Sequence, residues 1–351
     1  MWRTVLTLCA FSLLFGCNSD NKTVDESAPF SFEHQELNGA MVTRLYNEHD
    51  MLFAVTSDGL YINNNDSWQS AGLQGYELED VVAITEQHFI ASTSAENNEG
   101  NYASLLFETY NAGEDWVEIN HQFGLQGEKE SIFALAYDDI NARLYATGSG
   151  NLAYSEDMGI SWQLAYGEWQ QLGEQTTLVY NQENNEMWFG GNNAIGDATL
   201  VQLSLTDESA KVHLDESPTP SSTRAVRFAA DNAQSVYLVI GETIRHSADN
   251  GDTWQTILSA DDYRYYTDIA IDPNNPEYLF TSSLVPTVGQ PQFLTVEWSE
   301  NGGANWQQYQ YQGEGASTFG GVTSILLVQE QQQNVFYLGL GNGGIMRVEP
   351  Q

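Results

Sequence analysis

Hydrophobic and polar positions alternate with a period of two along most of the chain, in short runs separated by clusters of Asn, Asp and Gly. One unit reads SIFALAY, ARLYATG, NLAYS and WQLAY, and a later one reads AVRFAA, SVYLVIG, TIRHS and WQTIL. Such alternation between turn residues is typical of β-strands, and no long amphipathic helical pattern occurs. The pattern therefore predicts an all-β protein made of four-stranded units.

A polar octapeptide that ends in Trp joins the third and fourth strands of these units. It reads SEDMGISW at 155–162 and SADNGDTW at 247–254, and looser copies end at Trp68, Trp116 and Trp306. Successive copies lie 48, 46, 92 and 52 residues apart, and the double step leaves room for a polar turn without Trp near residue 208. A period near 46 residues with strand content predicts the blades of a β-propeller.

The number of units predicts seven blades over residues 30–350. The first strands are expected to begin near Met41, Asp80, Ser131, Thr176, Ala225, Asp268 and Thr323. The last unit lacks a fourth strand, and the segment 30–37 before the first unit alternates like an outer strand. Because an open propeller leaves terminal blades packed on one side only, we expect this N-terminal strand to close the ring. Six or eight blades are the alternatives.

The octapeptide resembles the Asp-box, or BNR repeat, of sialidase-like propellers, whose pattern is Ser-x-Asp-x-Gly-x-Thr-Trp. The resemblance implies a hairpin in which the Asp accepts turn N–H groups, the Gly supplies a positive φ and the Trp packs between blades. The residues at these places are Asp157, Gly159 and Trp162, then Asp249, Gly251 and Trp254, with Asn111 before Trp116 and Asn301 before Trp306. In the first copy, Asn63 and Asn65 replace the Asp and the Gly. We expect these residues to be structural; a calcium or ligand site at Asp157 and Asp249 is the alternative.

The N-terminus reads MWRTVLTLCAFSLLFGC, with Arg3 before a short apolar run. This run is too short to span a bilayer, and its end resembles a bacterial lipobox. We expect residues 1–16 to be a lipoprotein signal peptide, Cys17 to be acylated, and 17–29 to be a flexible tether. Asn18 resembles the outer-membrane sorting signal. An ordinary secretory signal is the alternative. Cys9 would leave with the signal, which excludes a disulfide in the mature chain.

The composition excludes several kinds of ligand. The chain has 11 Lys and Arg residues and 48 Asp and Glu residues, and the formal net charge is -37. Nucleic acid is excluded as a partner because its binding needs Lys and Arg, and strongly anionic ligands are disfavoured. The six His have no metal-binding spacing, and no Gly-rich phosphate loop precedes a helix. We therefore expect neither a metal nor a cofactor.

Ligands of propellers usually contact the loops between second and third strands and between blades, on the face opposite the octapeptides. The longest such loops are 94–102, 124–131, 165–176, 259–268, 283–293 and 313–321. They are rich in Tyr, Trp, Asn and Gln, which suits a glycan or a protein surface. The predicted binding residues are Trp169, Tyr263, Arg264, Tyr265 and Arg227. Packing of Trp169 and Tyr265 between blades is the alternative.

Charged residues near the starts of the first strands are expected to line the central channel. Asp80 and Asp268 occupy equivalent places in the second and sixth units, and Arg44, Arg224 and Arg227 lie at comparable places. A carboxylate pair across a channel is able to cleave glycosides by acid and base catalysis. A solvated ring of ion pairs is the alternative. Asp80 and Asp268 are thus the catalytic candidates.

Three family resemblances separate the possible functions. Sialidases grip a substrate carboxylate with three Arg, and a triad of Arg44, Arg227 and Arg264 lacks the accompanying Arg-Ile-Pro motif. Endo-β-glucanases of the xyloglucanase type need two propellers around one cleft, and this chain has one. Photosystem II assembly-factor-like proteins are single seven-bladed propellers, often exported lipoproteins that act as binding scaffolds. This resemblance implies a non-catalytic outer-membrane lipoprotein that binds an envelope protein or glycan; the alternative is a glycoside hydrolase that uses Asp80 and Asp268.

Overall fold

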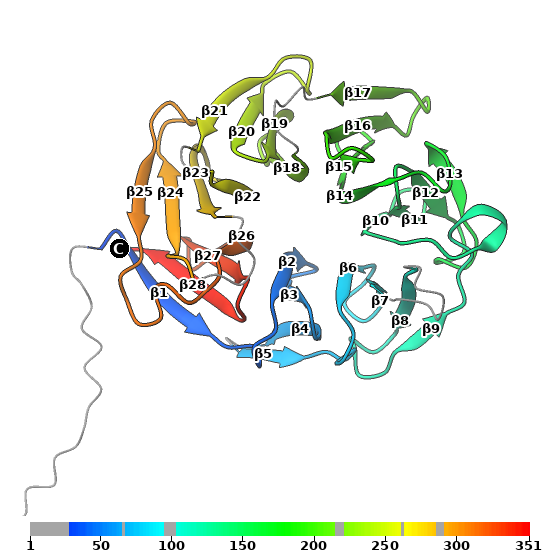
Figure 1. Cartoon of the computed structure of the whole chain (residues 1–351), viewed down its shortest axis with the longest axis horizontal. Helices are drawn as coiled ribbons and strands as arrows, with labels where there is room; N and C mark the ends of the chain where they lie inside the picture. The colour runs from blue at the N-terminus through cyan, green and yellow to red at the C-terminus, as the bar shows by residue number, and fades with distance from the viewer. Residues whose placement is uncertain (1–27, 65–66, 95–102, 215–220, 261–262, 286–290) are drawn as a thin grey trace, which may run out of the picture.

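The computed structural model describes residues 28–64, 67–94, 103–214, 221–260, 263–285 and 291–351. These residues form seven four-stranded antiparallel sheets arranged as blades around a central channel (Figure 1). A single short 3-10 helix, η1 (Leu125–Gly127), is the only helix among them. None of the described helices is long and apolar enough to cross a membrane. The predicted all-β fold with seven blades is confirmed.

The first four blades follow the chain without interruption, innermost strand first. Blade 1 comprises β2 (Val42–Glu48), β3 (Met51–Thr56), β4 (Gly59–Asn64) and β5 (Ser67–Ser70). Blade 2 comprises β6 (Leu78–Ala83), β7 (Phe89–Thr93), β8 (Leu105–Thr109) and β9 (Val117–Ile119). Blade 3 comprises β10 (Ala134–Asp138), β11 (Arg143–Thr147), β12 (Leu152–Ser155) and β13 (Gln163–Tyr166). Blade 4 comprises β14 (Gly173–Asn181), β15 (Glu186–Asn193), β16 (Ala198–Ser204) and β17 (Ala210–Leu214).

The last three blades complete the ring. Blade 5 comprises β18 (Thr223–Ala229), β19 (Asn232–Ile240), β20 (Thr243–Ser247) and β21 (Gln255–Ser259). Blade 6 comprises β22 (Tyr265–Asp272), β23 (Asn275–Leu284), β24 (Thr295–Ser299) and β25 (Gln307–Gln310). Blade 7 comprises β26 (Val322–Glu330), β27 (Gln333–Leu340), β28 (Ile345–Pro350) and, from the other end of the chain, β1 (Phe30–Gln35).

The N-terminal strand closes the ring as predicted. β1 pairs antiparallel with β28 from Phe30 opposite Pro350 to Gln35 opposite Ile345. The Phe30 ring meets Trp298 and Phe280 of blade 6 edge-on, with ring centroids 5.0 and 5.6 Å away. Each blade is therefore packed on both sides, and blade 7 gains the outer strand that its own segment of chain lacks.

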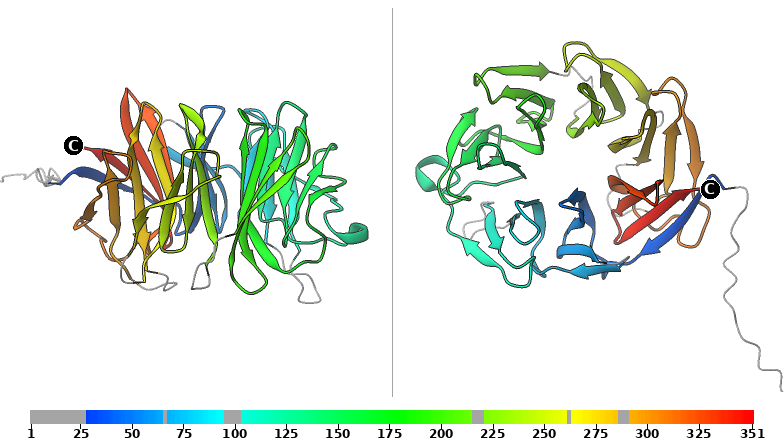
Figure 2. Two further views of the ribbon diagram at one scale, coloured as in Figure 1. Left: turned by 90° about the horizontal axis from the view of Figure 1, so that it is seen from above. Right: turned by 180° about the vertical axis from the view of Figure 1, so that it is seen from behind.

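The strand order gives the ring two distinct faces, seen edge-on in the left panel of Figure 2. Strands run across the thickness of the ring and alternate in direction. The turns between first and second strands and between third and fourth strands lie on one side, here called the octapeptide face. The turns between second and third strands and the links between blades lie on the other side, here called the connection face.

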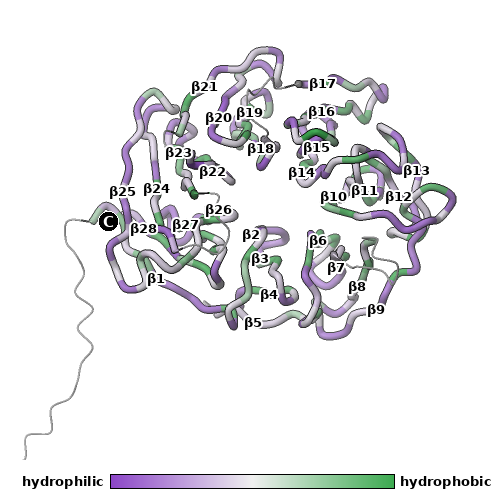
Figure 3. The backbone as a smooth tube through the Cα atoms, in the orientation of Figure 1, coloured by the Kyte–Doolittle hydropathy of each residue, from purple (hydrophilic) through white to green (hydrophobic). Residues whose placement is uncertain are grey.

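The hydrophobic core lies between neighbouring blades rather than in the channel. Middle strands are buried on both sides, as in β7, where all five residues are buried. Because both sheet faces are covered, apolar residues often follow one another in these strands instead of alternating with polar ones, and many of these segments are green in Figure 3. Aromatic pairs cross the blade interfaces: Phe53 meets Phe89 edge-on at 5.1 Å between centroids, and Phe280 stacks on Phe336 at 4.0 Å.

The octapeptides form the turns between third and fourth strands. In the turn between β20 and β21, Ser247 Oγ accepts the Gly251 N–H and donates to Asp249, both at 2.8 Å. Asp249 also accepts the N–H and hydroxyl of Thr253, and these bonds lower its pKa to about 2. Asp157 makes the same bonds with Ser155 and Ser161. The side chains of a short polar sequence thus accept hydrogen bonds from the backbone N–H groups of the same turn.

Glycine at the fifth position of the octapeptide is required by geometry. Gly159 has φ 95° and Gly251 has φ 83°, a region that L side chains rarely adopt. A Cβ atom on Gly159 would lie 2.6 Å from Leu106 Cδ2 of the preceding blade. The Trp indoles also reach backward: Trp116 Nε1 donates to Ala71 O at 2.8 Å, and Trp306 Nε1 donates to Ile257 O at 2.8 Å. These two turns therefore fasten their blades to the previous ones, whereas Trp162 Nε1 donates to Gly159 O of its own turn.

Two of the looser copies keep these bonds, and one does not. Asn111 and Asn301 accept backbone N–H groups in the places taken by Asp157 and Asp249. The prediction for the first copy is wrong, because Asn63 lies within β4 opposite Trp68 and the strand pairing continues to Asn64 opposite Ser67. Asn65 lies outside the described residues. Trp68 still reaches the neighbouring blade, where its Nε1 donates to Gln35 Oε1 at 2.9 Å.

Candidate functional site

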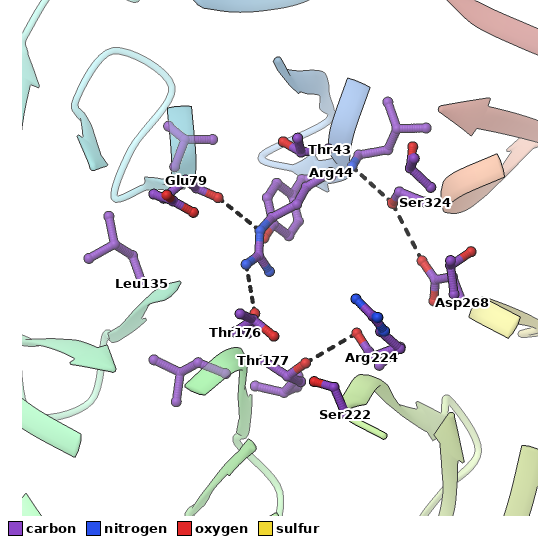
Figure 4. A pocket seen from close by; sticks show the side chains of 18 of the residues that line it. Thr43, Arg44, Glu79, Leu135, Thr176, Thr177, Ser222, Arg224, Asp268 and Ser324 are labelled. Atoms are coloured by element: carbon purple, nitrogen blue, oxygen red, sulfur yellow. Dashed lines mark hydrogen bonds between the residues drawn. The ribbon is translucent and has the colours of Figure 1, made fainter. Parts of the chain in front are cut away.

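The central channel holds a cavity of about 1480 Å³. The first strands of all seven blades line it, and it extends from Asn193 and Asn342 at the connection face to Asp139 and Gln182 at the octapeptide face. Polar and charged side chains dominate its upper part near the connection face, where the first strands begin (Figure 4). This upper opening, here called the mouth, is the candidate site.

Bulges at the starts of the first strands give the mouth its polarity. The register of the first strand shifts between Val42 and Arg44, Leu78 and Asp80, Glu174 and Thr177, Thr223 and Ala225, Tyr266 and Ile269, and Val322 and Ser324. A bulge interrupts the ladder and turns side chains and carbonyls out of the sheet. Six of the seven first strands therefore present polar groups toward the channel rather than toward their own blade.

Arg44 joins four blades by spanning the channel. From β2 its Nε donates to Glu79 O at 3.0 Å, and its Nη2 donates to Phe133 O at 3.1 Å and to Thr176 O at 2.6 Å. These acceptors belong to the starts of blades 2, 3 and 4. Arg44 Nε also lies 3.7 Å from Asp80 Oδ1. The guanidinium is thus committed to structural bonds (Figure 4).

Asp80 is a buried structural carboxylate. Its residue is 1% exposed, and burial raises its pKa. Its oxygens accept the Tyr46 hydroxyl at 2.6 Å, the Val81 N–H at 2.9 Å and the Leu135 N–H of blade 3 at 2.8 Å. One carboxylate therefore ties blades 1, 2 and 3 together, with few lone pairs left for a substrate.

Asp268 repeats this arrangement on the opposite side of the ring. It is 2% exposed and accepts the Ile269 N–H at 2.9 Å and the Ile325 N–H of blade 7 at 3.0 Å. Arg227 Nη2 of blade 5 donates to it at 2.8 Å. The two predicted catalytic carboxylates are thus equivalent in position, and both join neighbouring blades.

Arg224 is the one guanidinium in the mouth without a partner among the described residues. It is exposed, lines the cavity and points into it from the start of β18 (Figure 4). Its backbone is fixed, because Arg224 O accepts the Thr177 hydroxyl of blade 4 at 3.1 Å. Arg44, Arg224 and Arg227 therefore share one cavity, but two of them are engaged by the protein itself.

The predicted binding residues do not form one site. Tyr265 and Arg227 line the cavity. Tyr263 is 84% exposed at the connection face, and Arg264 Nη2 donates to Ser283 O at 3.0 Å outside the cavity lining. Trp169 packs edge-on against Phe123, with centroids 5.0 Å apart. The Trp169 ring thus lies in the interface between blades, and its binding of a ligand stays a prediction.

Two exposed aliphatic residues beside the mouth were not among the predicted binding residues. Leu172 is 75% exposed just before β14, and Ile195 is 78% exposed in the turn between β15 and β16. Gly173 pairs with Asn193, so both residues lie at the same end of blade 4. The sequence does contain a signal, since each stands as a lone large aliphatic residue among turn residues. Parts of the predicted loops 94–102, 259–268 and 283–293 lie outside the described residues.

The octapeptide end of the channel is acidic, but the described residues there form no cluster that would hold a metal ion. Burial raises the pKa of Glu48 to about 7, and its Oε2 accepts the Ala83 N–H at 2.8 Å. Asp139 accepts the Gln182 amide at 3.2 Å. Within the described ranges, no three His, Cys, Asp or Glu side chains converge in a way that would hold a metal ion.

The fold and mouth define a seven-bladed propeller with a polar channel. YCF48 bound to D1 peptide is similar at 15% identity with a TM-score of 0.64, covering 92% of this chain and 98% of that chain. YCF48 from Cyanidioschyzon merolae is similar at 12% identity with a TM-score of 0.63, covering 91% of this chain and 98% of that chain. The GH74 xyloglucanase from Xanthomonas campestris is similar at 14% identity and 0.68, covering 90% of this chain and 53% of that one. No family model and no curated protein matches the chain. These likenesses show the fold.

Proposed function

We propose that the chain is a non-catalytic binding module whose mouth receives a segment of another protein. The main support for the proposal is that some side chains at the mouth are used in bonds between blades, whereas others are exposed to solvent. Asp80 and Asp268 are engaged in bonds between blades, whereas Arg224, Leu172 and Ile195 are exposed, and Arg224 has no partner among the described residues. Groups that the fold does not need and leaves facing solvent are the ones available to a partner.

A glycoside hydrolase is the less supported function. It needs one carboxyl that protonates the leaving oxygen and a second that attacks or activates water, both in contact with the sugar. Asp80 and Asp268 are instead almost fully buried and each accepts backbone N–H groups from two blades. The likeness to a xyloglucanase is a likeness to a chain about twice as long, of which this chain covers 53%.

A protein segment is favoured over a glycan by the kind of side chain beside the mouth. Leu172 and Ile195 are aliphatic, and aliphatic surface gains most by contact with apolar side chains. The ring of Trp169, which would suit a sugar, is engaged with Phe123. A solved propeller of similar length, YCF48, has been observed with a bound peptide. That likeness supports the proposal without identifying the partner.

The proposal is tested with two libraries of random displayed peptides, one with free C-termini and one with free N-termini. Peptides that bind the protein are selected from each library, and their affinities for the protein are then measured. Ile195→Asp should weaken the selected peptides about ten-fold or more, because a charge would be placed in the apolar contact. Ile160→Asp is the matched control, since Ile160 is exposed on the octapeptide face. Failure of both libraries to enrich peptides, or equal effects of the two substitutions, would refute the proposal. A glycan array read in parallel should show no binding.

We further propose that the module is an envelope lipoprotein anchored through Cys17, with its mouth facing away from the membrane. Residues 1–27 lie outside the described residues, so the support is the lipobox-like sequence. β28 runs toward the octapeptide face, and antiparallel β1 therefore starts there, at Phe30. A tether that ends at Phe30 would leave from this face. We also propose that the octapeptides are Asp-box repeats.

The anchor is tested by labelling cells that express the chain with an alkyne-bearing fatty acid. The unmodified protein should be labelled and sediment with membranes, whereas Cys17→Ser should lose both properties. Labelling that persists in Cys17→Ser would contradict the anchor. Because no other Cys follows residue 17, a single Cys placed at Leu172 or Ile160 reports how near each face lies to quenchers in the lipid.

A further inference from the structure

We propose that Arg224 binds the C-terminal carboxylate of the protein segment that occupies the mouth. The inference rests on the proposed function and specifies its ligand. The proposed ligand is the C-terminal end of a protein chain, with at least one apolar residue close to that end.

Arg224 differs from its neighbours in having an unused binding capacity. Arg44 donates to three carbonyls, and Arg227 donates to Asp268 and to Val226 O. Arg224 has no such partner in the part of the chain that the structure describes, although its backbone is held in place by Thr177. A guanidinium presents a planar set of donors that matches a carboxylate in two-point contact. The guanidinium therefore has donors available in the cavity for an anion.

The exposed aliphatic residues lie on the link and the turn of blade 4 that adjoin the start of β18. Ser221 N–H donates to Gly196 O at 2.9 Å, which joins the link before β18 to the turn that carries Ile195. Leu172 lies at the same end of blade 4, next to Gly173. A segment whose last residues are apolar could thus cover Leu172 and Ile195 while its end reaches Arg224. The area between them, at Ser221 and Ser222, is lined by small side chains.

The surrounding charge selects a single carboxylate rather than an acidic stretch. Glu77 and Glu79 line the same mouth, and burial raises the pKa of Glu79, with Glu77 and Glu174 adding to the rise. The whole chain carries a formal charge of -37. A segment rich in Asp or Glu would be repelled. A neutral or basic segment that has one carboxylate at its end avoids this repulsion and still pairs with Arg224.

The shape of the channel also favours a chain end. Arg44 crosses the channel between blade 1 and the starts of blades 3 and 4, so it narrows the passage beyond the mouth. An internal segment that entered the mouth would have to turn and leave on the same side. A terminus can enter and stop at Arg224 without a turn, at a smaller cost in ordered residues.

The experiment compares synthetic versions of the selected peptides that end in a free carboxylate or in an amide. On the unmodified protein, the amide should bind about ten-fold or more weakly, the effect of losing a charged bidentate pair. Arg224→Gln should bind both versions equally weakly, and Arg224→Lys should retain part of the difference. Arg143→Gln is the charge-matched control, because Arg143 pairs with Glu156 on the opposite face. Thermal unfolding midpoints verify that each variant folds.

The outcomes separate this inference from the proposed function. Enrichment only from the library with free C-termini, together with the carboxylate effect, is the expected result. Peptides that bind with equal affinity as acids and amides, or that are unaffected by Arg224→Gln, would overturn the role of Arg224 while the mouth remained a binding site. The absence of any bound peptide from either library would instead refute the proposed function.

Discussion

Asp268 shows at the residue scale how the ring is held together. Its carboxylate accepts N–H groups from blades 6 and 7 and pairs with Arg227 of blade 5. Bonds of a buried carboxylate to backbone groups matter because water cannot replace them. Asp80 plays the same part between blades 1, 2 and 3. The same residues that make attractive catalytic candidates in the sequence are thus explained by stability.

Asp268→Asn tests this structural role. The amide replaces one acceptor with a donor that faces a backbone N–H and removes the charge that pairs with Arg227. We expect a loss of about 2–4 kcal/mol in the free energy of unfolding, measured by urea denaturation. Asp252→Asn is the control, because that exposed carboxylate pairs only with Lys211 and should change stability by about 0.5 kcal/mol or less. Equal effects would contradict the assignment.

Glu48 gives a prediction for pH. Burial raises its pKa in the folded protein from 4.5 to about 7. Between these values the folded state binds the proton more tightly than the unfolded state does. The stabilising contribution is therefore complete below about pH 4.5 and is lost as the pH rises through 7. Glu48→Gln keeps an oxygen for the Ala83 N–H and should stabilise the protein by about 1–3 kcal/mol at pH 8, with little effect at pH 4. A pH-independent difference would contradict the shift.

At the scale of elements, the octapeptide turn is a self-contained unit. Ser247 is 1% exposed, and its hydroxyl accepts the Gly251 N–H while donating to Asp249. Ser247→Ala leaves that buried N–H without an acceptor and should cost about 1–3 kcal/mol in urea denaturation. The turn in blade 4 provides the control, since Ser209 is exposed and its hydroxyl donates to the carboxylate of Asp207. If Ser209→Ala were as costly, the hydroxyl of Ser247 would not be the cause.

The elements themselves were largely predictable because their signals are local. Short alternating or apolar runs between turn residues mark the strands, and the bonds of an octapeptide run within a few residues, as from Asp157 to Ser161. The first copy departs from the prediction for a physical reason: a Trp at the right spacing also occurs where the pairing of β4 and β5 continues to Asn64 and Ser67. Strand bulges, which shape the mouth, leave no comparable local signal.

At the scale of the whole molecule, ring closure was predictable and the site was not. Seven units with a missing last strand and a spare first one determine the pairing of β1 with β28. The mouth depends on contacts between distant segments: Arg44 binds carbonyls 35, 89 and 132 residues away. A sequence shows that an Arg is present but does not show which Arg the fold consumes. Only the structure distinguishes Arg224 from Arg44 and Arg227.

The central claim is that recognition takes place at the mouth, on the connection face. Hydrogen–deuterium exchange of the protein with and without a selected peptide tests it most directly, because every backbone N–H reports where the ligand lies. We expect slower exchange at the start of β14, in the 193–196 turn and at 221–224, with no change at the octapeptide turns 155–162 and 247–254. Protection confined to the octapeptide turns, with none around the mouth, would contradict it.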